Sequence, residues 1–481
     1  MSQSRLASCV PLPIDNKILI SVVEKAKDWA LMHGVGMRDK KHFSKDSIQI
    51  APFVLLPSPF PRTEFTKAID LQPVLNELMH KVAHDDEFLE KTLQNALQVD
   101  DFTAKLYDVW LKVREEGIAQ SLSLGLFRSD YLMQQPDSNR IKQVEFNTVA
   151  ASFGAITSNL PAMYRYVLRQ LGHGELIKNM PENRALSGLC SGIIEAYDLF
   201  AVPSAVVIFV VEEVSYNICD QRFHEFEISE KRPDIMIYRK TLGEIYEETE
   251  LNDKKQLILD GQPVAVVYYR SGYEPAQYPS TKEWDARLRV ERSSAIKCPS
   301  IHYQLAGTKK VQQALAAPGV LETFMSEGAM TSRVRDIFTG LYSLDFDENG
   351  ERAVEMALAD AEKFVLKPQR EGGGNNLYGA DVKEALLRMR HSRERAAYIL
   401  MERILPPLVS GYVVRPGATV PPPLSDLVSE LGIFGVIIGN KDKIYCNRQV
   451  GHMLRTKLAD ANEGGVAAGL GALDSPYLLD L

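Results

Sequence analysis

Three strand-like segments in the middle of the chain most constrain its fold. They are SAVVIFVV (residues 204–211), DIMIYRKT (234–241) and VAVVYYRSGY (264–273), and polar or amphipathic sequence follows each of the first two. Continuous apolar runs of this length fit strands that are buried on both faces of a mostly parallel sheet. We therefore expect an α/β fold in which residues 205–305 form a compact α/β domain.

The chain before residue 120 has a different pattern. Between residues 16 and 120, apolar side chains recur at three- and four-residue steps with charged residues between them, which predicts mainly helix. Asp100 and Asp101 precede one such segment and are candidate N-caps, and Gly117 is a candidate helix end. We expect this part of the chain to be helical.

Strands and loops are predicted on both sides of the α/β block. Residues 121–133 and 140–155 have the pattern of two strands joined by a polar turn, and helix follows to about residue 200. After the block we predict strands at 362–369 and 398–404, a charged helix at 381–397, a Pro-rich loop at 415–426, an antiparallel pair of 429–438 with 443–457, and a loop at 464–473. The sequence contains no internal repeat.

The charge distribution argues against a nucleic-acid-binding protein. The formal net charge over 481 residues is −8, whereas such proteins concentrate basic residues on one face. One basic cluster is present, Arg388, Arg390, Arg393 and Arg395, but Glu394 interrupts it. We interpret these arginines as a solvated helix face.

Cysteines and the N-terminus indicate the compartment. The five cysteines are odd in number and far apart, at Cys9, Cys190, Cys219, Cys298 and Cys446. They form no C-x-x-C pair or disulfide ladder, which favours a reducing compartment. No apolar run is long enough for a signal peptide or a membrane span, and the nine histidines include no H-E-x-x-H motif. We expect a soluble, cytoplasmic protein without a zinc site or a membrane partner.

The most unusual segment is KPQREGGGNNLYG, residues 367–379, which follows the apolar run Phe364-Val365-Leu366. Neither the P-loop pattern nor the G-x-G-x-x-G pattern is present in it. Three glycines without side chains let backbone N–H groups approach an anion and let a loop move as a lid. A flexible tight turn is an equally good interpretation of the residues alone.

Acid and amide side chains occur near this segment and on a predicted strand. Glu145 and Asn147 point to the same face of a strand, because side chains alternate there. Two oxygen donors side by side suit Mg²⁺, which phosphates and water usually complete. An exposed strand with an E-x-N pattern is the ordinary alternative, but Glu371 and Asn376 in the glycine segment add a second acid and amide.

Six basic residues could neutralise anionic ligands: Lys309, Lys367, Lys457, Arg128, Arg270 and Arg455. The three arginines are predicted at the ends of apolar, strand-like runs, where a guanidinium can clamp a carboxylate with two hydrogen bonds. Solvated lysines and surface ion pairs are the common alternatives. G-x-S-x-G is absent and no cysteine has a flanking acid–base pattern. The residues therefore favour phosphoryl transfer from ATP or another phosphate donor, with Mg²⁺, to a substrate carrying carboxylates.

Several blocks of the sequence resemble the eukaryotic glutathione synthetases. The blocks are FRSDY, EFNTVAASFG, YYRSGY, QLAGTKKVQQ, FVLKPQREGGGNNLYG, YILME, SELGIFGV and GHMLRTK with GGVAAG. They follow in the same order and with similar gaps from about residue 50 to the C-terminus. Shared blocks of this length are far more specific than a single glycine motif.

The resemblance implies a circularly permuted ATP-grasp fold with an inserted smaller α/β substrate domain. The expected parts are 1–204, with helices and the first ATP-grasp portion, 205–305, which binds substrate, and 306–481, which carries the glycine lid. The implied enzyme is a cytoplasmic homodimeric ligase. It joins γ-glutamylcysteine and glycine through an acyl phosphate, using ATP and two Mg²⁺ ions, and releases ADP and phosphate.

Site residues carried over from the resemblance fall into three sets. The metal ligands implied are Glu145, Asn147 and Glu371. The implied nucleotide contacts are Glu145, Lys309, Lys367, Pro368, Gln369, Arg370, Glu371, Gly372, Gly373, Gly374, Asn375, Asn376, Tyr378, Met401, Glu402, Arg403, Ile404, Glu430, Lys457 and Glu463. The implied substrate contacts are Arg128, Val149, Ala150, Ala151, Ser152, Ser215, Tyr216, Asn217, Gln221, Arg270, Ser271, Gly272, Tyr273, Arg455, Val466 and Ala467, with Arg128 and Arg455 as the catalytic pair.

Three positions depart from the family pattern, and other functions stay open. Many relatives have serine at Ala150, and some have aspartate at Ser271 or at Glu463. A ligase for a different carboxylate and amine, or a nucleotide-binding pseudoenzyme, would share much of this sequence. The pseudoenzyme is disfavoured because every candidate metal and lysine position is filled.

Overall fold

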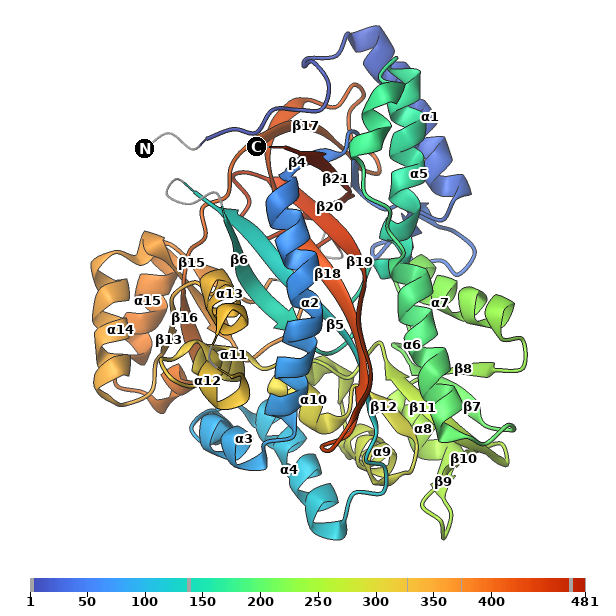
Figure 1. The fold of residues 1–481 in the computed structure, drawn as a ribbon, viewed down its shortest axis with the longest axis vertical. Helices are drawn as coiled ribbons and strands as arrows, with labels where there is room; N and C mark the ends of the chain where they lie inside the picture. Colours follow the sequence, from blue (N-terminus) through green and yellow to red (C-terminus); the bar gives the residue numbers. More distant parts are fainter. Residues whose placement is uncertain (1–3, 136–139, 327, 373, 467–469, 481) are drawn as a thin grey trace.

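A computed structural model describes residues 4–135, 140–326, 328–372, 374–466 and 470–480. Within them a 13-stranded sheet runs through the whole molecule, and a four-stranded sheet lies beside it. Figure 1 shows helices on both sides of the large sheet and the small sheet, with α14 and α15, at the left edge. The α/β class predicted from the sequence is confirmed.

The antiparallel part of the large sheet contains the two longest hairpins. Its strands are β3 (Phe53–Val54), β5 (Ser123–Gln134), β6 (Arg140–Asn147), β17 (Val409–Val414), β18 (Leu424–Gly439), β19 (Ile444–Leu458) and β20 (Gly471–Asp474). Among these strands, β20 pairs with β3 in parallel. β5 lies between β6 and β18, and β18 pairs with β19 along almost its full length. Both predicted strand pairs are therefore present, but the strand predicted at 140–155 ends at Asn147 and a helix begins at Gly154, so its last eight residues were assigned wrongly.

The parallel part of the large sheet contains the three apolar runs at 204–211, 234–241 and 264–273. β7 (Val206–Val210), β8 (Met236–Lys240), β11 (Gln262–Tyr269) and β12 (Ile296–Cys298) pair in parallel, and β9 (Thr249–Leu251) and β10 (Leu257–Leu259) extend the edge. β12 also pairs with β5 at Lys297 and Ser123, so the sheet continues into the antiparallel part. The domain boundaries at 204 and 305 stay a prediction.

Helices cover both faces of the large sheet because its strands alternate between two apolar faces. Phe127 and Tyr131 of β5 join the core beneath α2 (Arg62–Ala83) and α4 (Asp101–Glu116). Leu124 and Leu126 join the core beneath α1 (Asn16–Met32), α5 (Gly154–Gln170) and α6 (Ala185–Phe200). The other helices of the large body are α3 (Asp86–Leu93), α7 (Ile218–Lys231), α8 (Leu242–Glu248), α9 (Thr281–Arg292), α10 (Ile301–Ala306), α11 (Lys309–Ala316), α12 (Leu321–Phe324) and α13 (Ala329–Ile337).

The small sheet has its own core. It consists of β13 (Leu341–Ser343), β14 (Phe364–Pro368), β15 (Leu377–Tyr378) and β16 (Tyr398–Glu402), covered by α14 (Glu348–Ala359) and α15 (Ala380–Met389). Leu366, Leu386 and Leu400 are among its fully buried side chains. The glycine segment connects β14 to β15, so the lid starts and ends on one sheet.

Several local predictions need correction. Residues 33–61 are not helical: they contain β1 (Gly36–Met37), β2 (Gln49–Ile50), β3 and β4 (Ser58–Pro61), of which β4 pairs with the C-terminal β21 (Pro476–Leu479). These strands have only two to four residues and carry no readable periodicity. The predicted loop at 464–473 ends in β20, because Gly471 begins a strand that pairs with β19.

Capping residues were predicted partly correctly. Asp100 accepts a hydrogen bond from the Thr103 amide and caps α4, whereas Asp101 is the first helical residue and not a cap. Gly117 ends α4 with φ of 88°, as predicted. In the part of the chain that the structure describes, no helix is both long and apolar enough to cross a membrane.

The arginine cluster is not a uniformly solvated face. Arg395 is fully buried: its guanidinium lies 3.8 Å from the Phe346 ring centroid and donates to the Arg390 and Asp345 carbonyls. Its remaining partner is the Glu351 carboxylate. The prediction was wrong for Arg395 because sequence spacing does not show which turn of a helix meets a second helix.

Candidate active site

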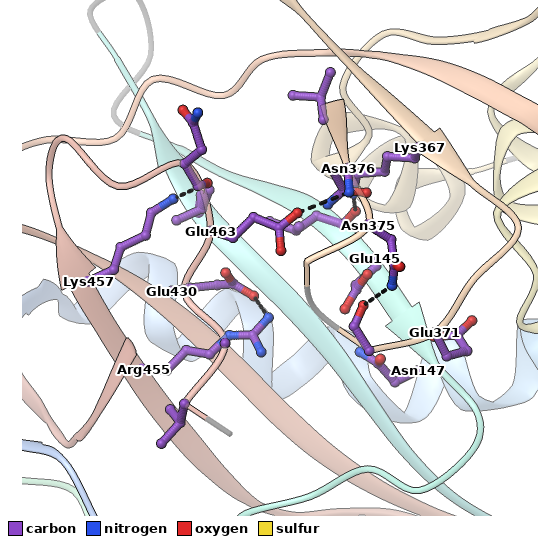
Figure 2. Close-up of a pocket in the computed structure, with 18 of the residues that line it drawn as sticks. Glu145, Asn147, Lys367, Glu371, Asn375, Asn376, Glu430, Arg455, Lys457 and Glu463 are labelled. Atoms are coloured by element: carbon purple, nitrogen blue, oxygen red, sulfur yellow. Dashed lines mark hydrogen bonds and ion pairs between the residues drawn. The ribbon is translucent and has the colours of Figure 1, made fainter. Parts of the chain in front are cut away.

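A cavity of about 550 Å³ lies between the large sheet and the small sheet. β5, β6, β18 and β19 form its floor, β14 and β16 form one wall, and the loop 459–466 forms another. Figure 2 shows Glu145, Asn147 and Glu371 on one side, and Glu430, Arg455 and Lys457 on the other. One face of β5 and β18 is thus apolar where α6 covers it and charged where it reaches the cavity.

Most of the site residues expected from the sequence line this cavity. They are Arg128, Glu145, Asn147, Val149, Ala150, Ala151, Ser152, Tyr273, Lys367, Glu371, Gly372, Asn375, Asn376, Tyr378, Met401, Glu402, Arg403, Ile404, Glu430, Arg455, Lys457, Glu463 and Val466. They come from segments up to 338 residues apart, counting from 128 to 466. Their roles toward ligands stay predictions.

Other expected residues are not among those that line the cavity. These are Lys309, Pro368, Gln369, Arg370, Gly374, Ser215, Tyr216, Asn217, Gln221, Arg270, Ser271 and Gly272, none of which is among the lining residues. Gly373 and Ala467 are outside the described residues. Residues 215–221 and 270–272 account for most of the set, and of these Arg270 contacts the loop 149–153.

Arg270 holds that loop through three contacts. Its guanidinium donates to the Ala151 carbonyl at 3.2 Å, the Ser152 hydroxyl at 2.9 Å and the Asp220 carboxylate at 3.0 Å. Asp220 also accepts from the amides of Phe153 at 2.9 Å and Ala155 at 3.0 Å, at the N-terminus of α5. Arg270 directly follows β11, as predicted, and it fixes the position of cavity-lining backbone.

Arg128 and Arg455 lie within strands on the cavity floor. Arg128 is in the middle of β5 and not at a strand end, which corrects the prediction. The Arg455 guanidinium lies 2.5 Å from Glu430 on the neighbouring strand β18. Burial opposes the charge of Arg455, but Glu430 and Asp130 raise its pKa above the usual range. Both guanidinium groups therefore present positive charge to any anion in the cavity.

Lys309 lies between two carboxylates. Its Nζ is 3.3 Å from Glu145 and 3.3 Å from Glu371. Burial disfavours its charge, but the two acids raise its pKa. The pKa of Glu145 is lowered by Lys309 and Lys367 against its burial, whereas burial raises the pKa of Glu371. The neighbouring lysines thus do not offset the burial of Glu371, and further positive charge would favour its ionised form.

These acids fit a divalent cation only with additional ligands. Among the described residues, no group of three or more His, Cys, Asp or Glu side chains is arranged to hold a metal ion. Glu145, Asn147 and Glu371 provide two carboxylates and one amide. Such oxygen donors suit Mg²⁺, which commonly takes its remaining ligands from phosphates and water.

The glycine segment presents backbone donors to an acid. The amides of Gly374 and Asn376 both donate to the Glu463 carboxylate, the latter at 3.1 Å. Gly372 and Gly374 have φ of 83° and 96°, a backbone conformation that favours glycine. Two amides on one carboxylate show that this segment can bind an anionic oxygen.

The base of the same segment is anchored. Lys367 donates to the Val144 carbonyl at 2.9 Å, and the Gln369 side chain accepts from the Lys310 amide at 3.0 Å. Arg370 pairs with Asp100, the cap of α4. Gln369 and Arg370 therefore fix the glycine segment at its β14 end.

Sequence reasoning missed several lining residues: Lys40, Leu132, Val144, Phe153, Glu274, Val365, Leu405, Pro406, Val428, Ala459, Ala461, Asn462, Gly464 and Gly465. Leu132 is four residues after Arg128 on β5, so strand alternation could have identified it. Lys40 belongs to a loop without any motif. Its position depends on the pairing of β1 with β2, which the sequence did not indicate.

Comparisons with known proteins agree with this geometry. Residues 16–478 match the family model described as eukaryotic glutathione synthase, ATP binding domain. The glutathione synthetase of Xenopus laevis is 43% identical over 469 residues, covering 97% of this chain and 98% of the relative. The human glutathione synthetase is 44% identical over 467 residues, with 96% and 98% covered.

A plant relative and a solved structure extend the comparison. The chloroplastic glutathione synthetase of Arabidopsis thaliana is 39% identical over 475 residues, covering 97% of this chain and 86% of its own. The apo structure of a glutathione synthetase-like effector, GSS30, from Globodera pallida superposes with a TM-score of 0.79 at 26% identity, covering 98% and 100% of the two chains. The chain belongs to the eukaryotic glutathione synthase family.

Proposed function

We propose that this protein is a glutathione synthetase, an ATP-dependent ligase that joins γ-glutamylcysteine to glycine. The observation that carries the proposal is the match to glutathione synthetases over nearly the whole chain. The cavity supports it, since it combines lysines and backbone amides for phosphate with two arginines for carboxylate. We also infer that the fold is an ATP-grasp fold of the circularly permuted type.

The residues suit activation of a carboxylate as an acyl phosphate. Lys367, Lys309 and the lid amides would bind the phosphates of ATP, while Arg128 and Arg455 would hold the dipeptide carboxylate and stabilise the charge of the transition state. The amine of glycine then attacks the acyl carbon, and phosphate leaves. Closure of the lid would exclude water, which would otherwise hydrolyse the acyl phosphate.

Glu145, Asn147 and Glu371 would hold the magnesium that we propose as cofactor. Bound Mg²⁺ would neutralise phosphate charge during transfer. The contact of both acids with Lys309, together with the pKa of Glu371 that burial raises, supports a cation at this position.

We further propose a cytoplasmic homodimer. Two observations support it: apolar side chains are exposed on α1 and α7, with Met32 80% and Phe226 60% exposed, and all five cysteines, which lie in the described residues, are free. The plant relative is chloroplastic by name. Analytical ultracentrifugation and subcellular fractionation test these two points.

Product release tests the activity. ADP and phosphate release is measured with ATP and Mg²⁺, adding γ-glutamylcysteine and glycine singly and together. Release that needs both, with glutathione formed in equal amount, is expected. No stimulation by the pair would refute the proposal, and stimulation by another amine would redirect it to a different carboxylate–amine ligase.

The variant Glu371→Ala tests the magnesium site. It should abolish turnover while leaving the fold intact, because Glu371 lies on the lid and not in the core. Glu384→Ala, on the exposed side of α15, is the matched control and should retain full activity. Wild-type turnover in Glu371→Ala would exclude its role as a metal ligand.

A further inference from the structure

Asp130 lies on the same face of β5 as Arg128 and Leu132, which line the cavity, and it was not among the expected site residues. It is completely buried in β5, two residues from Arg128, opposite Glu145 on β6 and Gly432 on β18. It does not line the cavity. Its neighbours, however, include three residues that do.

The Asp130 carboxylate accepts hydrogen bonds from all three. Arg128 donates with Nε at 2.6 Å and Nη2 at 2.8 Å, which fixes the guanidinium plane. The Asn147 amide nitrogen donates at 3.0 Å, and Arg455 Nη2 lies at 3.5 Å. One buried acid thus contacts both arginines and the amide of the candidate metal site.

The contact with Asn147 determines which way its amide faces. An ionised carboxylate only accepts hydrogen bonds, so the NH₂ group of Asn147 must face Asp130. The carbonyl oxygen of the same amide is then directed away from Asp130. Asn147 lines the cavity beside Glu145 (Figure 2), so this oxygen is the atom offered on the cavity side.

The opposing strand leaves room for this arrangement. A Cβ atom at Gly432 would lie 2.9 Å from the Asp130 oxygen and 2.9 Å from Arg128 Cδ. Both distances are shorter than a normal contact. The pair Arg128–Asp130 therefore occupies the space that a side chain on β18 would fill.

We propose that Asp130 is a positioning residue, which orients the Asn147 amide so that its oxygen faces the divalent cation and fixes the plane of Arg128. The proposal rests on the proposed function, in which Asn147 is a metal ligand. Residues that orient a metal ligand typically change metal affinity 10- to 100-fold when they are removed.

Binding of Mn²⁺ provides a readout that does not depend on turnover. Free and bound Mn²⁺ are measured by electron paramagnetic resonance on the full-length protein with a non-hydrolysable ATP analogue. Asp130→Ala should bind Mn²⁺ about 10- to 100-fold more weakly in its folded fraction. Unchanged affinity would mean that Asp130 only compensates the charge of the arginines, and would overturn the proposal.

An exchange of acid and amide tests orientation even if Asp130→Ala fails to fold. Asn147→Asp alone places two carboxylates together without a donor between them, so it should bind Mn²⁺ more weakly than the wild type. In Asp130→Asn/Asn147→Asp the new amide can donate to Asp at 147, whose second oxygen faces the cavity. Affinity should rise well above that of Asn147→Asp alone, because residue 147 again has a hydrogen-bonded partner and directs one oxygen to the cavity.

These Mn²⁺ measurements distinguish a wrong role for Asp130 from a wrong metal site. Tighter binding by Asn147→Asp than by the wild type, or no recovery in the double variant, would overturn the role of Asp130. A wild type that binds no Mn²⁺ with the nucleotide would overturn the proposed metal site itself. Asp474→Asn is the matched control, a buried acid in the same sheet that accepts from Ser58 and Thr456, and should leave Mn²⁺ affinity unchanged.

Discussion

Two buried arginine–aspartate pairs lie near the cavity. One contacts side chains and the other contacts backbone. Arg128 and Asp130 are two residues apart on one strand, and the remaining partners of Asp130 are cavity side chains. Arg270 and Asp220 are 50 residues apart in the sequence, and the remaining partners of Asp220 are backbone amides of α5. The first pair positions side chains that line the cavity, whereas the second fixes the backbone at the N-terminus of α5.

Removal of Asp220 should have the largest effect, and that effect should be on stability. Asp220→Ala leaves Arg270 buried without its carboxylate and uncaps α5, which should cost about 3–5 kcal/mol of unfolding free energy. Urea unfolding measures it. Asp220→Asn, which keeps an oxygen acceptor, should lose less. A loss below about 1 kcal/mol in Asp220→Ala would break the comparison between the pairs.

Removal of the Arg128 charge should act on catalysis. Arg128→Met keeps much of the side-chain volume but removes the cation that faces the dipeptide carboxylate. We expect kcat/KM to fall about 10²-fold or more, which is roughly 2.7 kcal/mol of transition-state stabilisation. Steady-state kinetics and circular dichroism on the same sample separate this loss from misfolding. Near-normal kcat/KM in a folded variant would contradict the assignment.

His80 is a buried polar residue that, unlike the two arginine–aspartate pairs, is held by neutral hydrogen-bond partners. His80 is 4% exposed; its Nδ1 lies 2.6 Å from the Tyr303 hydroxyl and its Nε2 lies 2.9 Å from the Asn440 carbonyl. Both contacts are satisfied by the neutral ring. Burial, with the neighbouring His84, lowers the pKa of His80 from 6.5 to about 4.

This shift makes the fold sensitive to acid. The folded protein binds the His80 proton less tightly than the unfolded chain, so the stability it contributes is present above pH 6.5 and is lost as the pH falls toward 4. About 2 kcal/mol should be lost between pH 7 and pH 5, measured by urea unfolding at each pH. His80→Gln, which can make both hydrogen bonds without titrating, should flatten this slope; an equally steep slope in that variant would exclude His80.

Sequence predicted the parts of this site that local rules govern. Alternation placed Glu145 and Asn147 on one face, composition identified the glycine segment, and capping preferences identified Asp100 and Gly117. The resemblance to a family supplied the distant residues of the cavity. These predictions succeeded because each depended on neighbours in the sequence or on shared blocks.

The rest depended on long-range pairing. Asp130 seemed an ordinary strand residue, because its importance comes from Asn147 and Arg455, 17 and 325 residues away. His80 and His84 form an H-x-x-x-H pair that is not a zinc motif. The His84 ring contacts both His80 and the edge of His302, whose place on α10 was not predicted. Such clusters are assembled by packing, which spacing alone does not reveal.

Gly432 has a consequence for how this protein tolerates mutation. It is not among the residues that line the cavity, and an added Cβ there would lie within 2.9 Å of Met453, Arg128 and Asp130. Every other amino acid carries that atom, so the position admits no conservative substitute. In a library of random variants, changes at 432 should disappear with the inactive clones, although the residue does not itself line the cavity.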